Sequence, residues 1–179
     1  MTLIDPKAAS LLGKENYSPQ KTIQDVKIIE LKRFTGEDGS FNEAVRIDNG
    51  KVVLPSELYG FEVKQINHSR VVPNTVKAWH LHQNQDEIWF IHPEAKLIVG
   101  LLDVRENSPT NGLSMKFALG DGRAHLLYIP REVAHGLSNP YYQDATMTYL
   151  VNNWFDGADE LRLPYYYIVE REFWDLSRG

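Results

Sequence analysis

The sequence predicts an all-β protein in which many short strands form a sandwich or barrel, preceded by one short helix. Apolar and polar side chains alternate in short runs over most of the chain, for example at residues 61–68. Turn-forming residues separate these runs, for example at 37–39 and 48–50. Because 179 residues can bury a substantial core, we expect one domain over residues 1–179.

The first expected element is a helix over residues 5–13. Asp5 can cap its N-terminus, Pro6 suits the first helical turn, and Gly13 suits the exit. The expected strands are 26–34, 41–47, 61–68, 75–82, 87–91, 96–104, 113–119, 125–129 and 145–152. The aromatic segment 164–174 predicts a closing strand or helix packed on the barrel.

The composition argues against several classes of partner. A net charge of −5 gives no cationic footprint for nucleic acid or for an anionic membrane. The chain has no cysteine, which excludes disulfides, thiolate zinc sites and a thiol nucleophile. Residues 1–12 contain no apolar run of signal-peptide length, and no later stretch approaches the length of a membrane span. We therefore expect a cytoplasmic protein that binds neither nucleic acid nor membrane.

Two motifs carry chemistry. The first contains His80, His82 and Glu87. Alternation along a strand points both imidazoles to one side, and a turn at 83–85 can return the carboxylate beside them. Such a group can hold a divalent metal or move protons on a substrate carbon. The second motif contains Pro130, His135 and Asn139 in the spacing Pro-x4-His-x3-Asn.

Both motifs resemble those of the cupin superfamily, a double-stranded β-helix barrel of jelly-roll type. The resemblance implies that a metal-binding member would hold one divalent ion with His80, His82, Glu87 and His135. The glycines usual in these motifs are missing, and Glu132 stands where the second motif normally has glycine.

Over residues 24–163 the chain resembles, more narrowly, the dTDP-4-dehydrorhamnose 3,5-epimerase family. The segment Asp103-Val104-Arg105-Glu106-Asn107-Ser108-Pro109-Thr110-Asn111-Gly112 is close to the family's Asp-x-Arg-x-x-Ser-Pro-Thr-x-Gly. Residues 129–136 follow its Ile-Pro-x-x-x-Ala-His-Gly, residues 65–69 its Gln-x-Asn-x-Ser, and residues 77–80 occupy the place of its Arg-Gly-Leu-His.

This second resemblance implies a homodimer that epimerises a nucleotide-linked 4-keto-6-deoxy sugar without a cofactor. By position, His80 would remove a proton next to the keto group, and Tyr149 would return one on the other face. The expected substrate-binding residues are Gln65, Asn67, Ser69, Lys77 and His135, with Lys77 near the diphosphate.

The catalytic set of the family is matched only in part. Glu87 stands at the place of a lysine that stabilises the enolate, and a carboxylate there would repel it. No carboxylate stands in register with the aspartate that orients the family's histidine, which falls near residues 164–165. Asp38 replaces an arginine that faces phosphate, and His82 replaces a glutamine.

Three hypotheses therefore stay open. The chain is an epimerase or isomerase of a nucleotide-linked keto sugar, a metal-dependent cupin enzyme such as an oxygenase or sugar isomerase, or a sugar-binding cupin without catalysis. A metal could also polarise the keto oxygen of a sugar in place of the missing lysine.

Overall fold

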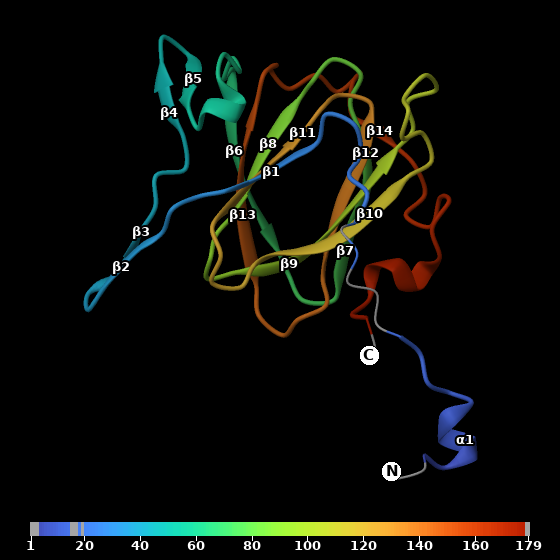
Figure 1. Cartoon of the computed structure of the whole chain (residues 1–179). Helices are drawn as coiled ribbons and strands as arrows, with labels where there is room; N and C mark the ends of the chain where they lie inside the picture. Colours follow the sequence, from blue (N-terminus) through green and yellow to red (C-terminus); the bar gives the residue numbers. More distant parts are fainter. Residues whose placement is uncertain (1–3, 15–17, 19, 178–179) are drawn as a thin grey trace.

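The computed structural model describes residues 4–14, 18 and 20–177. Two five-stranded sheets face each other in a barrel (Figure 1). In spatial order, the first contains β1 (Lys27–Glu30), β11 (His125–Ile129), β8 (Glu87–Ile91), β13 (Ala145–Val151) and β6 (Gln65–Val71). The second contains β10 (Ser114–Gly120), β9 (Lys96–Asp103), β12 (Val133–Asn139), β7 (Thr75–Leu81) and β14 (Leu161–Arg162). This architecture confirms the predicted cupin-like jelly roll.

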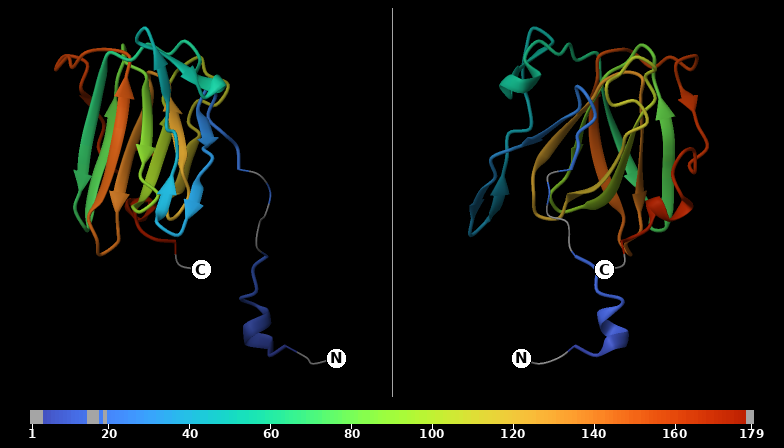
Figure 2. Two further views of the ribbon diagram at one scale, coloured as in Figure 1. Left: turned by 90° about the vertical axis from the view of Figure 1, so that its left-hand side faces the viewer. Right: turned by 45° about the vertical axis from the view of Figure 1, so that its right-hand side comes forward.

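The remaining elements are short. They are α1 (Pro6–Ala9), the hairpin of β2 (Phe34–Gly36) and β3 (Gly39–Phe41), the hairpin of β4 (Arg46–Asp48) and β5 (Lys51–Leu54), and the 3-10 helices η1 (Ser56–Leu58) and η2 (Arg171–Trp174). Both views in Figure 2 show α1 well away from the sheets. In the described residues, no helix is long and apolar enough to cross a membrane.

Several predicted boundaries were wrong. The helix expected over 5–13 ends at Ala9, although Asp5 caps it as predicted, its side chain accepting hydrogen bonds from the amides of Lys7 and Ala8. The strand expected at 41–47 divides between β3 and β4. Strand β12 was not predicted, because its polar residues hide the alternation, yet every residue in it is buried.

The interior of the barrel is divided between an apolar core and a polar cavity. Residues from both sheets build the apolar part, among them Ile91, Leu101 and Leu127, each at most 1% exposed. Strand β6 instead turns polar side chains inward. Its half-buried residues Gln65, Asn67 and Ser69 alternate with exposed ones. Polar inward residues open the interior to a ligand.

The C-terminal segment packs on the outside of the second sheet. The rings of Trp174 and Trp79 lie with centroids 4.7 Å apart, and both side chains are buried. A side chain at Gly100 would place its Cβ 2.5 Å from the Trp174 ring, so the position requires glycine. This confirms the predicted closing element. Before that element the chain forms β14, which pairs with β7 and brings Arg162 opposite His80.

Candidate active site

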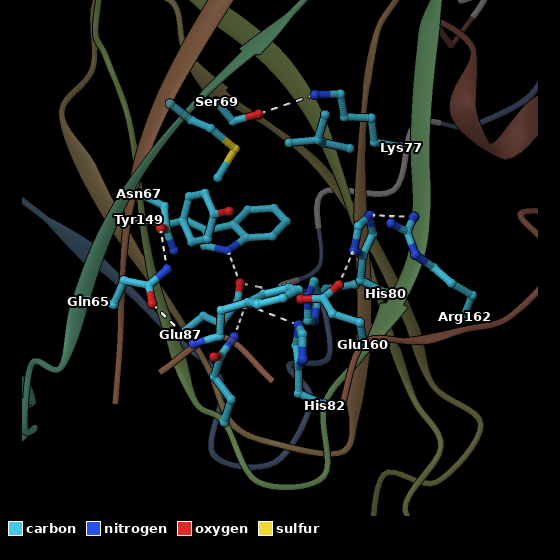
Figure 3. Close-up of a pocket in the computed structure, with 16 residues that line it drawn as sticks. Gln65, Asn67, Ser69, Lys77, His80, His82, Glu87, Tyr149, Glu160 and Arg162 are labelled. Carbon is cyan, nitrogen blue, oxygen red and sulfur yellow. Dashed lines mark hydrogen bonds and ion pairs between the residues drawn. The ribbon is translucent and has the colours of Figure 1, made fainter. Parts of the chain in front are cut away.

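A cavity of about 480 Å³ opens between the two sheets and contains every predicted site residue. Its walls come mainly from β6, β7, β8 and β13, with β14 at one edge. Figure 3 shows Tyr149 and His80 on opposite sides of this pocket. Two clusters differ in burial. We name His80, Glu160 and Arg162 the rim cluster, and His82, Glu87 and His135 the floor cluster.

The rim cluster holds His80 between a cation and a carboxylate. Arg162 Nη1 lies 2.8 Å from His80 Nε2. Because a guanidinium only donates, this nitrogen must be unprotonated, and the ring proton sits on Nδ1. Nδ1 faces Glu160 Oε2 at 3.9 Å. Burial, the neighbouring His135 and the Arg162 guanidinium lower the pKa of His80 to about 3. His80 is therefore a neutral imidazole at physiological pH.

The floor cluster is almost closed to solvent. The side chains of His82, Glu87 and His135 are each about 5% exposed. His82 Nε2 lies 3.3 Å from Glu87 Oε1, and His135 Nε2 lies 3.7 Å from Glu87 Oε2. Gln85 and Trp89 also donate hydrogen bonds to the Glu87 carboxylate. Glu87 is thus a buried anion that several donors satisfy.

Charges within the floor cluster follow from these contacts. Burial alone would raise the pKa of Glu87. His135, His82 and Trp89 outweigh this effect and bring the pKa down to about 2. Burial lowers the pKa of His82, but the hydrogen bond and charge of Glu87 more than offset this, so that this pKa lies above its ordinary 6.5. For His135, burial dominates and the pKa is lowered. The carboxylate thus favours a charged His82 beside a neutral His135.

The donor set of the floor cluster fits a divalent metal. The Nδ1 atoms of His82 and His135 each lie 2.9 Å from a backbone carbonyl, of Asp159 and Val133 respectively. A carbonyl only accepts, so each Nδ1 carries a proton. Both Nε2 atoms face Glu87, and His82 would have to release its Nε2 proton before that nitrogen could bind a metal. One ligand atom from each residue lies within 4.8 Å of the other two. Carbonyl-anchored imidazoles with one carboxylate are a common metal environment.

His80, the fourth predicted metal ligand, is not part of this group. Its ring stacks on His135 with centroids 6.0 Å apart. Its Nε2 faces Arg162 rather than Glu87. The structure therefore brings together three of the four predicted ligands.

Strand β12 carries His135 into the site through a constrained turn. Glu132, just before the strand, has φ of 63°, in the left-handed region that favours glycine. Its amide donates a 2.7 Å hydrogen bond to the His82 carbonyl. A positive φ explains why glycine is usual at this place in the motif, and Glu132 adopts such a φ although it has a side chain.

Residues 20–166 match the sequence model of the family described as dTDP-4-dehydrorhamnose 3,5-epimerase. The chain belongs to this family. The resemblance predicted over 24–163 is thereby confirmed.

Curated relatives carry related names. The spore coat polysaccharide biosynthesis protein SpsL of Bacillus subtilis is 33% identical over 145 residues, which cover 80% of this chain and 90% of SpsL. The probable low-salt glycan biosynthesis epimerase Agl13 of Haloferax volcanii is 28% identical, with 80% and 88% covered.

Solved structures share the fold. NovW of Streptomyces spheroides, a 4-keto-6-deoxy sugar epimerase, superposes with a TM-score of 0.75 at 20% identity, covering 88% of this chain and 78% of NovW. RmlC of Legionella pneumophila, in complex with dTDP-4-keto-L-rhamnose, gives 0.74 at 21% identity, with 88% and 82% covered.

The polar wall expected from the epimerase motifs lies in the cavity. Gln65 donates a 2.7 Å hydrogen bond to Asn67, and its oxygen accepts one from the Phe155 amide. Lys77 Nζ donates to Ser69 Oγ at 3.2 Å and to the carbonyl of Arg70 at 2.9 Å. This wall therefore offers amide groups and one ammonium to a ligand.

Two site residues were missed by sequence reasoning. Glu160 supplies a carboxylate near His80, although none stands at 164–165. Arg162 supplies a cation at the same imidazole. The signal that could have found them is the alternation Glu160-Leu161-Arg162-Leu163, which is typical of a strand with one polar face.

Proposed function

We propose that this protein is an epimerase or isomerase of a nucleotide-linked 4-keto-6-deoxy sugar. The observation that carries the proposal is that His80 and Tyr149 line one cavity from opposing sheets. A neutral imidazole on one side and a phenol on the other are the base and acid that inversion at carbon requires. Burial, with Glu87 and Glu160, raises the pKa of Tyr149, which keeps the phenol protonated.

The reaction moves one proton on each face. His80 Nε2 takes the proton from the carbon next to the keto group, and the C–H electron pair forms an enolate. Tyr149 then donates its hydroxyl proton to the other face of that carbon, and the carbonyl re-forms. Water returns a proton to the Tyr149 phenolate and removes one from His80. This chemistry needs no cofactor.

The polar wall suits a nucleotide diphosphate sugar. Gln65 and Asn67 offer amide hydrogen bonds, Ser69 a hydroxyl, and Lys77 a positive charge for the diphosphate. His135 lines the floor below, where it can contact the sugar. NovW, named as a 4-keto-6-deoxy sugar epimerase, and the RmlC complex with dTDP-4-keto-L-rhamnose support the same substrate class.

We also propose a homodimer. Large apolar side chains are exposed on the β2–β3 hairpin and on β6, with Phe34 51%, Phe41 66% and Ile66 58% exposed. Exposed apolar side chains on a separate hairpin and on the edge strand of a sheet fit an interface between subunits. The cytoplasmic location and the lack of nucleic-acid and membrane partners stay predictions.

A metal-dependent enzyme is the second proposal, because the floor cluster fits a divalent ion. His82, Glu87 and His135 would hold the ion, which would supply Lewis-acid polarisation of a substrate oxygen. Elemental mass spectrometry of protein purified without a tag or chelator tests it. A stoichiometric metal, with activity lost on chelation, would favour the metal enzyme, and activity that survives complete metal removal would exclude it.

Incubation with dTDP-4-keto-6-deoxyglucose tests the first proposal. We expect NMR to detect inversion at a carbon next to the keto group. Tight binding without any chemical change, under every metal condition, would instead favour a sugar-binding protein. A matched variant, His80→Asn, serves as the inactive control.

A further inference from the structure

The cavity lacks an obvious group for the negative charge that proton abstraction creates. When the C–H bond breaks, the electron pair moves onto the keto oxygen, and an enolate needs a cation or strong donors beside it. Glu87 on the floor is anionic and cannot serve. His82 has both ring nitrogens engaged, Nδ1 with the carbonyl of Asp159 and Nε2 with Glu87.

Two cationic side chains line the cavity. Lys77 already donates to Ser69 and to the Arg70 carbonyl, toward the polar wall. Arg162 lies directly on His80, with Nη1 2.8 Å from Nε2. In the described part of the chain, no carboxylate lies within salt-bridge distance of this guanidinium. Arg162 is thus a cation without an anion, at the atom that must accept the proton.

The contact also creates a conflict that substrate binding can resolve. His80 Nε2 cannot take a proton while Arg162 donates to its lone pair. Arg162 is exposed and comes from the end of a two-residue strand, so its side chain has room to move. A carbon poised to lose its proton lies about 3–3.5 Å from the base nitrogen. Its keto oxygen is therefore within reach of the displaced guanidinium.

We propose that Arg162 is a catalytic residue that leaves His80 when the keto sugar enters and pairs with the enolate oxygen. When Arg162 moves from His80 to the enolate oxygen, the Nε2 lone pair becomes free to accept the proton. The anionic oxygen is a better partner for the guanidinium than the neutral imidazole is. The proton passes to His80, the electron pair to the oxygen beside Arg162, and both return when Tyr149 protonates the other face. This role rests on the proposed epimerase function.

The test compares Arg162→Ala, Arg162→Lys and a matched control, Arg123→Ala, in the exposed turn between β10 and β11. Solvent deuterium incorporation into dTDP-4-keto-6-deoxyglucose measures proton abstraction, and calorimetry with dTDP measures nucleotide binding. We expect Arg162→Ala to slow incorporation by about 10²- to 10³-fold. Its affinity for dTDP should be unchanged, and Arg123→Ala should match the wild type in both measurements.

Two further readouts separate a direct role from loss of structure. Added guanidinium ion should restore part of the activity of Arg162→Ala but none to His80→Asn. Arg162→Lys should retain more activity than Arg162→Ala, since it keeps the charge but not the fork of donors. Removing the cation should also shift the acidic limb of the pH profile, where His80 becomes protonated, to higher pH, because Arg162 lowers the pKa of His80.

Three results would overturn the proposal in different ways. Wild-type protein that incorporates no deuterium would refute the proposed function and this role together. An Arg162→Ala protein as active as the wild type would refute only the role of Arg162. A loss of dTDP affinity that matches the loss of incorporation would make Arg162 a phosphate ligand instead.

Discussion

The rim and the floor of the cavity use the same residue type for opposite purposes. His80 and His82 both lie on or next to β7 and line the same cavity. Burial, His135 and the Arg162 guanidinium at Nε2 lower the pKa of His80 to about 3. Burial also acts on His82, but the carboxylate at its Nε2 outweighs it and raises the pKa. The charged side chain at each Nε2 thus separates the two histidines: His80 at the rim is a neutral base, and His82 at the floor is paired with a buried carboxylate.

Replacing His80 should have the largest effect. His80→Asn keeps a hydrogen-bonding group at the rim but removes the base, so turnover should fall by about 10²- to 10⁴-fold. Steady-state kinetics with the keto sugar provides the measurement. The matched floor variant, His82→Asn, should lose less activity while it loses more stability. A His80→Asn protein with full activity would remove the distinction between rim and floor.

Tyr149→Phe should separate inversion from exchange. The variant loses the acid on one face but keeps His80 on the other, so inversion should slow by about 10²-fold or more. Deuterium exchange with retained configuration should continue, because His80 can return a proton to the face from which it came. NMR of the sugar in heavy water reports both. Equal loss of exchange and inversion would contradict separate roles.

Glu87→Gln should affect stability before it affects proton transfer. Removing one partner of a buried pair leaves His82 without its counter-charge, at a cost on the order of 3 kcal/mol in the free energy of unfolding. Urea denaturation measures this change. Unchanged stability would mean that the floor cluster does not hold a fixed ion pair.

Glu87→Gln should also change how the free energy of unfolding depends on pH. The folded pKa of Glu87, about 2, lies below its ordinary 4.5. Its contribution to stability is therefore present above pH 4.5 and lost as the pH falls toward 2. Glu87→Gln should flatten the stability profile in that window. An unaltered profile would assign the acid sensitivity to other groups.

Glu160→Gln should have the smallest effect. Its carboxylate lies 3.9 Å from His80 Nδ1, longer than a hydrogen bond, and the side chain is 34% exposed. We expect a loss of about tenfold or less in kcat, with KM unchanged, if the carboxylate only orients the ring. A loss as large as that of His80→Asn would give Glu160 a direct part in proton transfer.

Local patterns predicted most strands and the three histidines of the site, but not the rim residues Glu160 and Arg162. The spacing of His82 and Glu87 already implied that they meet, since alternation and a turn are local rules. Arg162 reaches His80 only through β14, a two-residue strand that pairs with β7 from far along the chain. No local rule specifies such a pairing. Strand β12 was missed for a related reason: its buried Ser138 and Asn139 donate hydrogen bonds to the carbonyls of Trp174 and Val71, which are far away in the sequence.

Solvent deuterium incorporation by metal-depleted wild-type protein is the most direct test of proton transfer at the rim. With dTDP-4-keto-6-deoxyglucose in heavy water, we expect deuterium at a carbon next to the keto group, at a rate that His80→Asn abolishes. A sugar recovered with every C–H bond intact would contradict the proposed reaction. Incorporation that returns only after a divalent metal is added would instead support a metal-dependent reaction at the floor cluster.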